Sequence, residues 1–367
     1  MTTRPAPKPY ILGIHAYVPG KATASDGRAL IKLSANENPL GSSPAALTAL
    51  EPAPGEAASY PDPDAKELRA AIADLHGLDA ERIVCGTGSG ELLHCIVQAL
   101  AGVGDEVVFS RYSFSLYPLL AYKVGATPVF AEDNDLAASV DALLNAVTQR
   151  TKLVLLDNPN NPIGTFLPAK EVARLHAGLP KDVLLVVDQA YAEYLAPEMD
   201  DGGFALAEKH ENVICTRTFS KAYGLAAERI GWATGSAHLI DLINRIRGPF
   251  NVTLSGQNAA FAALGDQDFV AASRAHNTAE RGRFVEAIAA LGNHGLSAVP
   301  SEANFVLVNF DGELRAETAL HAIAEAGYAV RHLPGQGLAN ALRITIGKSE
   351  DMARVTAVLR VLCGETV

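Results

Sequence analysis

The stretch KLVLLDNPNNPIGTFLPAKEVARLHAGLPKDVLLVVDQAYAEY, residues 152–194, contains the pattern that decides the fold. An apolar run at 152–157 ends in polar residues, a helix-like segment follows at 168–179, and a second apolar run at 183–188 again ends in polar residues. A helix between two short, fully apolar strands is typical of a parallel sheet that is covered on both faces.

The same alternation extends in both directions from this stretch. Further apolar runs are IVCG (83–86), EVVFS (106–110), TPVFAE (127–132), NVICT (212–216) and IGWAT (230–234), and DAKELRAAIADLH (64–76) is one of the helical segments between such runs. We therefore predict an α/β fold in which helices sandwich a mostly parallel, seven-stranded sheet.

The pattern changes towards the ends of the chain. Residues 1–35 are rich in Pro, Gly and Ala and predict an extended N-terminal arm, followed by a large domain over 36–265. Beyond a charged helical stretch, the runs NFVLVNF, AVRHL and LRITIG and helices at 315–326 and 350–362 predict a smaller α+β domain over 266–367.

Composition excludes several classes of protein. The 367 residues carry 30 Lys and Arg against 41 Asp and Glu, a net charge of −11, so no nucleic-acid partner is expected. No apolar run reaches the ~18 residues of a membrane helix, and no apolar signal core opens the chain. The 4 cysteines and 10 histidines show no metal-ligand spacing, so we expect a cytoplasmic enzyme with reduced thiols and no metal.

Lys221 is the first candidate catalytic residue, because TRTFSKAYGLAAER (216–229) places it after an apolar strand and a Ser/Thr cluster. Arg229 follows eight positions later. An amine at a strand end can form an imine with a cofactor aldehyde, while Ser220 and Arg229 can bind a phosphate. A lysine is otherwise most often a solvated surface charge.

The glycine-rich segment GTGSGE (86–91) is a candidate phosphate loop, since it lies between the strand ERIVC and the helix ELLHCIVQAL. Glycines allow close approach, and the first N–H groups of a helix attract an anion. The spacing fits neither a P-loop nor a dinucleotide fold, so a small phosphate is predicted. A plain glycine turn that starts a helix is the alternative.

Asp188 ends a strongly hydrophobic strand and needs a cationic or hydrogen-bonding partner if it is buried. The protonated pyridine nitrogen of pyridoxal 5'-phosphate would be such a partner, and Tyr191 and Asn161 could donate to the ring oxygen O3′. A strand-end aspartate that caps the next helix is the competing interpretation. Of the aromatic residues in RYSFSLYP, we select Phe114 as the plate over the ring, although aromatic residues are by default core.

Six segments in order resemble the histidinol-phosphate aminotransferase family of pyridoxal-phosphate fold type I enzymes. They are KLSANENPLGSSP (32–44), SYPDPDAKELRAAIA (59–73), DNPNNPIG (157–164), VDQAYAEY (187–194), TRTFSKAYGLAAERIG (216–231) and LRITIG (342–347). The resemblance covers essentially the whole chain.

The resemblance implies a role for each matched position. It implies Lys221 as the imine-forming lysine, Asp188 at the pyridine nitrogen, Asn161 and Tyr191 at O3′, and Ser89, Gly90, Ser220 and Arg229 at the cofactor phosphate. It also implies a homodimer with shared sites, in which Tyr60 reaches the neighbouring subunit's phosphate. Arg331 and Arg343 match arginines that hold the anionic end of the substrate, and Tyr17 matches a phosphate-contacting tyrosine of the N-terminal arm. Asn161 is also assigned to the substrate-binding residues. Two positions depart from the family pattern, Gly90 where Asp is often found and Phe114 where Tyr is frequent.

The function implied by the resemblance is transfer of an amino group between glutamate and histidinol phosphate, a step in histidine biosynthesis. An aromatic amino acid aminotransferase remains the nearest alternative, because the same arginines accept phenylalanine or tyrosine. A decarboxylase or a β-eliminating lyase would use the same cofactor for another bond. A non-catalytic regulator domain would need a DNA-binding module, for which the arm before residue 36 is too short.

Overall fold

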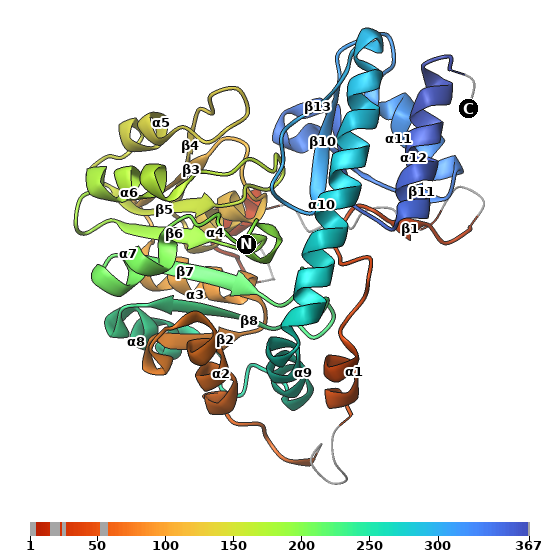
Figure 1. Ribbon diagram of the computed structural model, residues 1–367. Coiled ribbons are helices and arrows are strands. Elements are labelled where there is room, and N and C mark those ends of the chain that lie inside the picture. Colours follow the sequence, from red (N-terminus) through yellow and green to blue (C-terminus); the bar gives the residue numbers. More distant parts are fainter. Residues whose placement is uncertain (1–4, 15–22, 24–26, 52–57, 366–367) are drawn as a thin grey trace.

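The computed structural model describes residues 5–14, 23, 27–51 and 58–365. In Figure 1 a broad sheet with helices on both faces forms a large unit, and a smaller sheet with helices lies beside it. Among the described residues, every helix is too short or too polar to traverse a bilayer.

The large sheet has seven strands, as the sequence predicts, in the order β2-β8-β7-β6-β5-β3-β4. Only β8 runs antiparallel to its neighbours β2 and β7, and all other pairs are parallel. The strands are β2 (Ile83–Gly86), β3 (Glu106–Ser110), β4 (Thr127–Ala131), β5 (Thr151–Asp157), β6 (Leu184–Asp188), β7 (Val213–Thr218) and β8 (Gly231–Gly235).

Helices cover both faces of this sheet because its central strands are apolar at successive positions. Leu153 and Leu155 pack against α3, α4 and α8, whereas Val154 and Leu156 on the opposite face pack against α5, α6 and α7. These helices are α3 (Ser89–Leu100), α4 (Leu116–Val124), α5 (Val140–Asn145), α6 (Ala169–Gly178), α7 (Gly203–Lys209) and α8 (Ala237–Ile246). The mostly parallel α/β sandwich is therefore confirmed.

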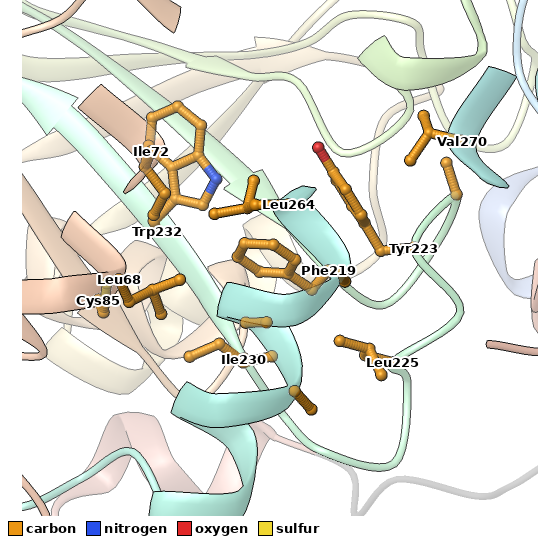
Figure 2. Packing of buried hydrophobic residues seen from close by; sticks show 14 of the residues in the cluster. Leu68, Ile72, Cys85, Phe219, Tyr223, Leu225, Ile230, Trp232, Leu264 and Val270 are labelled. Carbon is orange, nitrogen blue, oxygen red and sulfur yellow. The ribbon is translucent and has the colours of Figure 1, made fainter. Parts of the chain in front are cut away.

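A further core lies between the large sheet and the helices α1 (Pro44–Ala49), α2 (Lys66–His76) and α9 (Leu254–Gly265). Figure 2 shows Phe219, Tyr223 and Leu225, from the loop after β7, in this core with Trp232 and Leu264. Apolar anchors on both sides of Lys221 thus fix the loop that carries it.

The smaller unit contains a four-stranded antiparallel sheet, ordered β12-β13-β10-β9, and a short parallel pair of β1 with β11. Its elements are β9 (Leu296–Ala298), β10 (Phe305–Phe310), β11 (Tyr328–Ala329), β12 (Arg331–Leu333), β13 (Leu338–Thr345), α11 (Ala316–Glu325) and α12 (Ser349–Leu362). The long helix α10 (Gln267–Ala290) runs between the two units (Figure 1). β1 (Ile31–Lys32), from the predicted arm, joins this unit; the domain limits at 35/36 and 265/266 stay predictions.

Short 3-10 turns complete the described elements. They are η1 (Pro9–Gly13), η3 (Ala80–Arg82), η4 (Ala192–Tyr194), η5 (Gly292–His294) and η6 (Pro334–Gln336). The turn η4 directly follows the segment that carries Tyr191, and it packs against α10.

Candidate active site

A cavity of about 580 Å³ opens where the carboxyl ends of β5, β6 and β7 meet the start of α3 and the strands β12 and β13. Its walls include most of the site residues predicted from the sequence: Ser89, Gly90, Phe114, Asn161, Asp188, Tyr191, Ser220, Lys221, Arg229, Arg331 and Arg343. Strand ends gather ligand-binding residues in open α/β sheets, which explains this convergence.

One predicted residue that the structure describes, Tyr60, is not part of this wall. Tyr60 is 82% exposed and stacks on Phe250, with ring centroids 4.5 Å apart. Such an exposed aromatic side chain is available to another molecule rather than to the cavity of its own chain. Tyr17 lies outside the described residues.

Lys221 follows β7 in the loop anchored by Phe219 and Tyr223. Its Nζ donates a hydrogen bond to the Ala35 carbonyl oxygen at 3.1 Å. Burial, and then the positive charge of Arg343, lower the pKa of Lys221 from 10.5 to about 8. The amine is therefore partly neutral near physiological pH, as a nucleophile or base must be.

Asp188 ends β6 and is buried at the base of the cavity. It accepts hydrogen bonds from Thr216 Oγ1 at 2.9 Å and from Tyr117 Oη at 3.2 Å. Burial raises the pKa of Asp188 to about 6, and no lysine or arginine among the described residues forms an ion pair with it. A buried carboxylate held only by neutral donors fits a cationic group in the cavity.

Asn161 links Tyr191 to Arg343 of the small sheet. Its Nδ2 donates to Tyr191 Oη at 3.2 Å, and its Oδ1 accepts from Arg343 Nη1 at 2.5 Å. Arg343 also donates to the Ser34 carbonyl oxygen at 2.7 Å. Burial raises the pKa of Tyr191 to about 12, so its hydroxyl stays protonated.

Arg343 lies beside Arg331 because β12 and β13 pair antiparallel with these two residues in register. Within the described part of the chain, no hydrogen-bond or ion-pair partner is found for the Arg331 guanidinium, which lines the cavity. The small sheet therefore presents two cations at one wall of the cavity.

The part of the cavity wall at the start of α3 also suits an anion. Ser89 and Gly90 open the 12-residue helix α3, whose first N–H groups have no partner within the helix. Arg229 Nη1 donates to Ser220 Oγ at 3.2 Å and to the Ala226 carbonyl oxygen at 2.8 Å. Gly88 precedes α3 with φ +83°, and a Cβ there would lie 2.7 Å from Arg229 Nη2, so only glycine admits the guanidinium so close to the loop.

Phe114 reaches the cavity from the loop between β3 and α4. Its N–H donates to Asp157 Oδ2 at 3.1 Å, and Asp157 also accepts from the Asn161 N–H at 2.8 Å. Burial raises the pKa of Asp157 to about 8. Through these two hydrogen bonds, Asp157 holds Phe114 and Asn161 at the end of β5.

Several cavity contacts were not predicted from the sequence. Tyr117 is fully buried and bonded to Asp188 rather than stacked in the cavity, although it lies in the predicted aromatic segment. Phe114 precedes α4 and accepts at its carbonyl oxygen from the Tyr117 N–H at 2.9 Å, so the shared aromatic segment is the local signal. Asn36 and Asp157 lie in the quoted segments at 32–44 and 157–164, but Tyr191, which Asn36 contacts, and Phe114, which Asp157 contacts, are distant in sequence.

Comparison with known proteins agrees with this geometry. Residues 28–359 match the family described as aminotransferase class I and II. The chain belongs to this aminotransferase family. The aminotransferase is 69% identical over 353 residues to the histidinol-phosphate aminotransferase of Erythrobacter litoralis, covering 96% of both chains. It is 56% identical over 363 residues to that of Sphingopyxis alaskensis, covering 98% of both.

Among solved structures, the aminotransferase is similar to the histidinol-phosphate aminotransferase of Sinorhizobium meliloti in complex with pyridoxal-5'-phosphate. The TM-score is 0.87, the identity is 31%, and 99% of each chain is covered. These findings confirm the predicted family and its fold, and they identify the chain as a pyridoxal-phosphate-dependent transaminase.

The cavity of this aminotransferase fits the cofactor in its chemistry. Asp188, which is buried and has no ion-pair partner in the described part of the chain, suits a protonated ring nitrogen, and the start of α3 with Arg229 suits a phosphate. Lys221 lines the same cavity, and its pKa is lowered to about 8. The residues present are therefore compatible with pyridoxal phosphate at both of its charged ends.

Proposed function

We propose that this enzyme transfers an amino group between glutamate/2-oxoglutarate and the pair histidinol phosphate/imidazole-acetol phosphate, as a step of histidine biosynthesis. The observation that carries the proposal is the near full-length similarity, at 69% and 56% identity, to histidinol-phosphate aminotransferases. Two arginines in the same cavity as Lys221 support it, since both substrates are anionic.

Bound pyridoxal phosphate would supply an electron-withdrawing ring that stabilises negative charge at the substrate Cα. Asp188 would hold the proton on the ring nitrogen through an ion pair. Tyr191 and Asn161 would donate to the ring oxygen O3′, and Phe114 would cover one ring face. Lys221 Nζ would carry the cofactor in the resting enzyme and move a proton between Cα and the cofactor carbon C4′ during turnover.

The cofactor phosphate would be held by the N–H groups of Ser89 and Gly90, by the Ser220 hydroxyl and by Arg229. The helix start and the guanidinium both favour a dianion. This arrangement fixes one end of the cofactor while the reaction proceeds at the other end.

Substrate recognition would rest on Arg343, Arg331 and Tyr17. Arg343, which bonds Asn161 and Ser34, suits the carboxylate of glutamate or the phosphate of histidinol phosphate. Arg331 has no partner among the described residues, so its guanidinium would be available to donate charge-assisted hydrogen bonds to the substrate phosphate.

We further propose a cytoplasmic homodimer with shared sites and small-molecule substrates, without a nucleic-acid or membrane partner. The exposure of Tyr60 supports this, because its ring stands away from its own cavity and could reach the cofactor phosphate of a second copy.

A half-reaction panel tests the proposed substrate. The purified enzyme with bound cofactor is mixed with histidinol phosphate, histidinol, glutamate, phenylalanine or aspartate, and the conversion of the cofactor absorbance is recorded. Histidinol phosphate should exceed histidinol in kcat/KM by orders of magnitude. A larger kcat/KM for phenylalanine or tyrosine would instead establish the aromatic aminotransferase.

An arginine variant sharpens this test. Arg331→Ala should lower kcat/KM for histidinol phosphate by about 10- to 100-fold, the effect of one or two charge-assisted hydrogen bonds, and should affect histidinol much less. Arg354→Ala, at an exposed position of α12, is the matched control and should change neither substrate. Equal losses on both substrates would contradict phosphate binding by Arg331.

A further inference from the structure

The Tyr191 hydroxyl contacts a second amide, in addition to Asn161. Asn36 Nδ2 donates to Tyr191 Oη at 2.9 Å, across 155 positions of sequence. Asn36 is 1% exposed and has the left-handed backbone conformation, with φ +57°. Its carbonyl oxygen also accepts from Asn304 Nδ2 at 3.0 Å, so the backbone is held as well as the side chain.

The small sheet determines the orientation of both amides. An arginine can only donate, so the bond from Arg343 fixes Oδ1 of Asn161 and turns its Nδ2 towards Tyr191. Thr345 acts on Asn36 in the same way, because its Oγ1 donates to Asn36 Oδ1 at 2.9 Å and accepts from the Asn36 N–H at 3.1 Å. A flipped Asn36 would leave the Thr345 hydroxyl proton without this acceptor.

Arg343 and Thr345 are two residues apart on β13 and therefore lie on the same face of the strand. Each reaches the Tyr191 oxygen through one asparagine. With both lone-pair directions of that oxygen facing N–H donors, the phenol proton is left to donate into the cavity. If only one amide N–H donated to the Tyr191 oxygen, the hydroxyl could rotate and donate its proton to another protein group instead of into the cavity.

We propose that Asn36, oriented by Thr345, is a positioning residue that directs the Tyr191 hydroxyl proton to the ring oxygen of the bound cofactor. This inference rests on the proposed function, because it requires pyridoxal phosphate in the cavity with its ring oxygen towards Tyr191. Asn36 and Thr345 would act through Tyr191 without touching cofactor or substrate.

The test is a pH titration of the cofactor absorbance in the holoenzyme without substrate. The lysine-bound cofactor shares a titrating proton between its nitrogen and the ring oxygen. A hydrogen bond from Tyr191 to this oxygen stabilises the deprotonated form, so it lowers the pH midpoint of the absorbance change. Thr345→Val, which keeps the side-chain shape, should raise the midpoint by about one pH unit, a tenfold change in the equilibrium. Asn36→Gly, which tolerates the left-handed backbone, should raise it as much.

Charge effects are controlled in this design. The charged groups that act on the Tyr191 ring or hydroxyl are Arg343, Asp188, Asp157 and Lys221, and Thr345→Val changes none of them. Thr151→Val is the matched control, because Thr151 is also a buried strand threonine with a bonded hydroxyl, at the far end of β5. It should leave the midpoint unchanged.

A double-mutant cycle separates positioning from general loosening of the site. Tyr191→Phe should raise the midpoint on its own, and adding Thr345→Val to it should produce no further shift. Additive shifts, or an unchanged midpoint in Thr345→Val, would overturn the inference while the cofactor is still bound. If Asn36→Gly does not fold, Thr345→Val alone decides. Absence of the cofactor absorbance from the parent enzyme would refute the proposed function, and the inference with it.

Discussion

The replacement Asp188→Asn should stabilise the apoenzyme while it impairs catalysis. Among the described residues, the folded apoenzyme provides Thr216 and Tyr117 as the hydrogen-bond partners of this buried carboxylate. Burial raises the pKa of Asp188 from 3.8 to about 6. Because the folded pKa lies above the unfolded one, the ionised carboxylate opposes folding. This penalty develops as the pH rises from about 4 to about 6 and is complete above that range.

The magnitude follows from the pKa difference. A shift of roughly two pH units corresponds to about 3 kcal/mol at pH 8, and about half of this is present at pH 5. The asparagine side chain of the variant is uncharged and escapes the penalty at every pH, whereas its altered hydrogen bonds change stability equally at both pH values. The stability gain of the variant should therefore be ~1 to 2 kcal/mol larger at pH 8 than at pH 5. The charge of Asp188 also contributes to the raised pKa of Asp157. Its removal should lower the pKa of Asp157 and add to the stability gain at pH 8.

Urea unfolding of the apoenzymes at pH 5 and pH 8 measures this difference, at one fixed protein concentration because association would add to stability. Transamination by the holoenzyme should fall by two to four decades, or ~3 to 5 kcal/mol, when the ring nitrogen loses its anion. An equal stability change at the two pH values would refute the electrostatic reasoning. Near-parental turnover with bound cofactor would show that Asp188 is not the partner of the ring nitrogen.

The remaining predictions concern the phosphate loop, the cofactor lysine and the shared site. Gly88→Ala should weaken cofactor binding at least tenfold, because its Cβ would displace Arg229 and its φ is positive; equilibrium titration of the apoenzyme measures this, and Gly265→Ala, with open space around it, is the control. Borohydride reduction and peptide mapping should find the pyridoxyl group on Lys221, and its attachment to another lysine would contradict the assignment. Inactive Tyr60→Ala and Lys221→Ala proteins should regain activity after subunit exchange, and no recovery despite demonstrated exchange would argue against shared sites.

The fold was largely predictable because its signal is local. The seven apolar runs found in the sequence coincide with the strands of the large sheet, since a strand covered on both faces must be apolar at successive positions. The antiparallel direction of β8 was not specified by its own sequence. It depends on which neighbours the strand pairs with, β2 on one side and β7 on the other.

The sequence placed Asp188 and Lys221 at strand ends that the structure brings to one cavity, and their catalytic roles stay predictions. The site was not predictable where a residue acts through a distant partner. The Tyr117 bond to Asp188 spans 71 positions, and the Thr345 bond to Asn36 spans 309. Asn36 lies in a segment that resembles the family, yet its type alone does not reveal which oxygen its amide faces.

The register of the large sheet places two buried carboxylates side by side, and a cationic cofactor would reduce their repulsion. Asp157 and Asp188 end neighbouring parallel strands as direct register partners, and both are buried. Like charges so close raise each other's free energy, and the hydrogen bonds to Asp157 from Phe114 and Asn161 offset this only in part. A cationic ring nitrogen beside Asp188 would relieve both carboxylates. Cofactor affinity should therefore include this relief, and the stabilisation of the enzyme by the cofactor should increase between pH 5 and pH 8, where the carboxylates ionise.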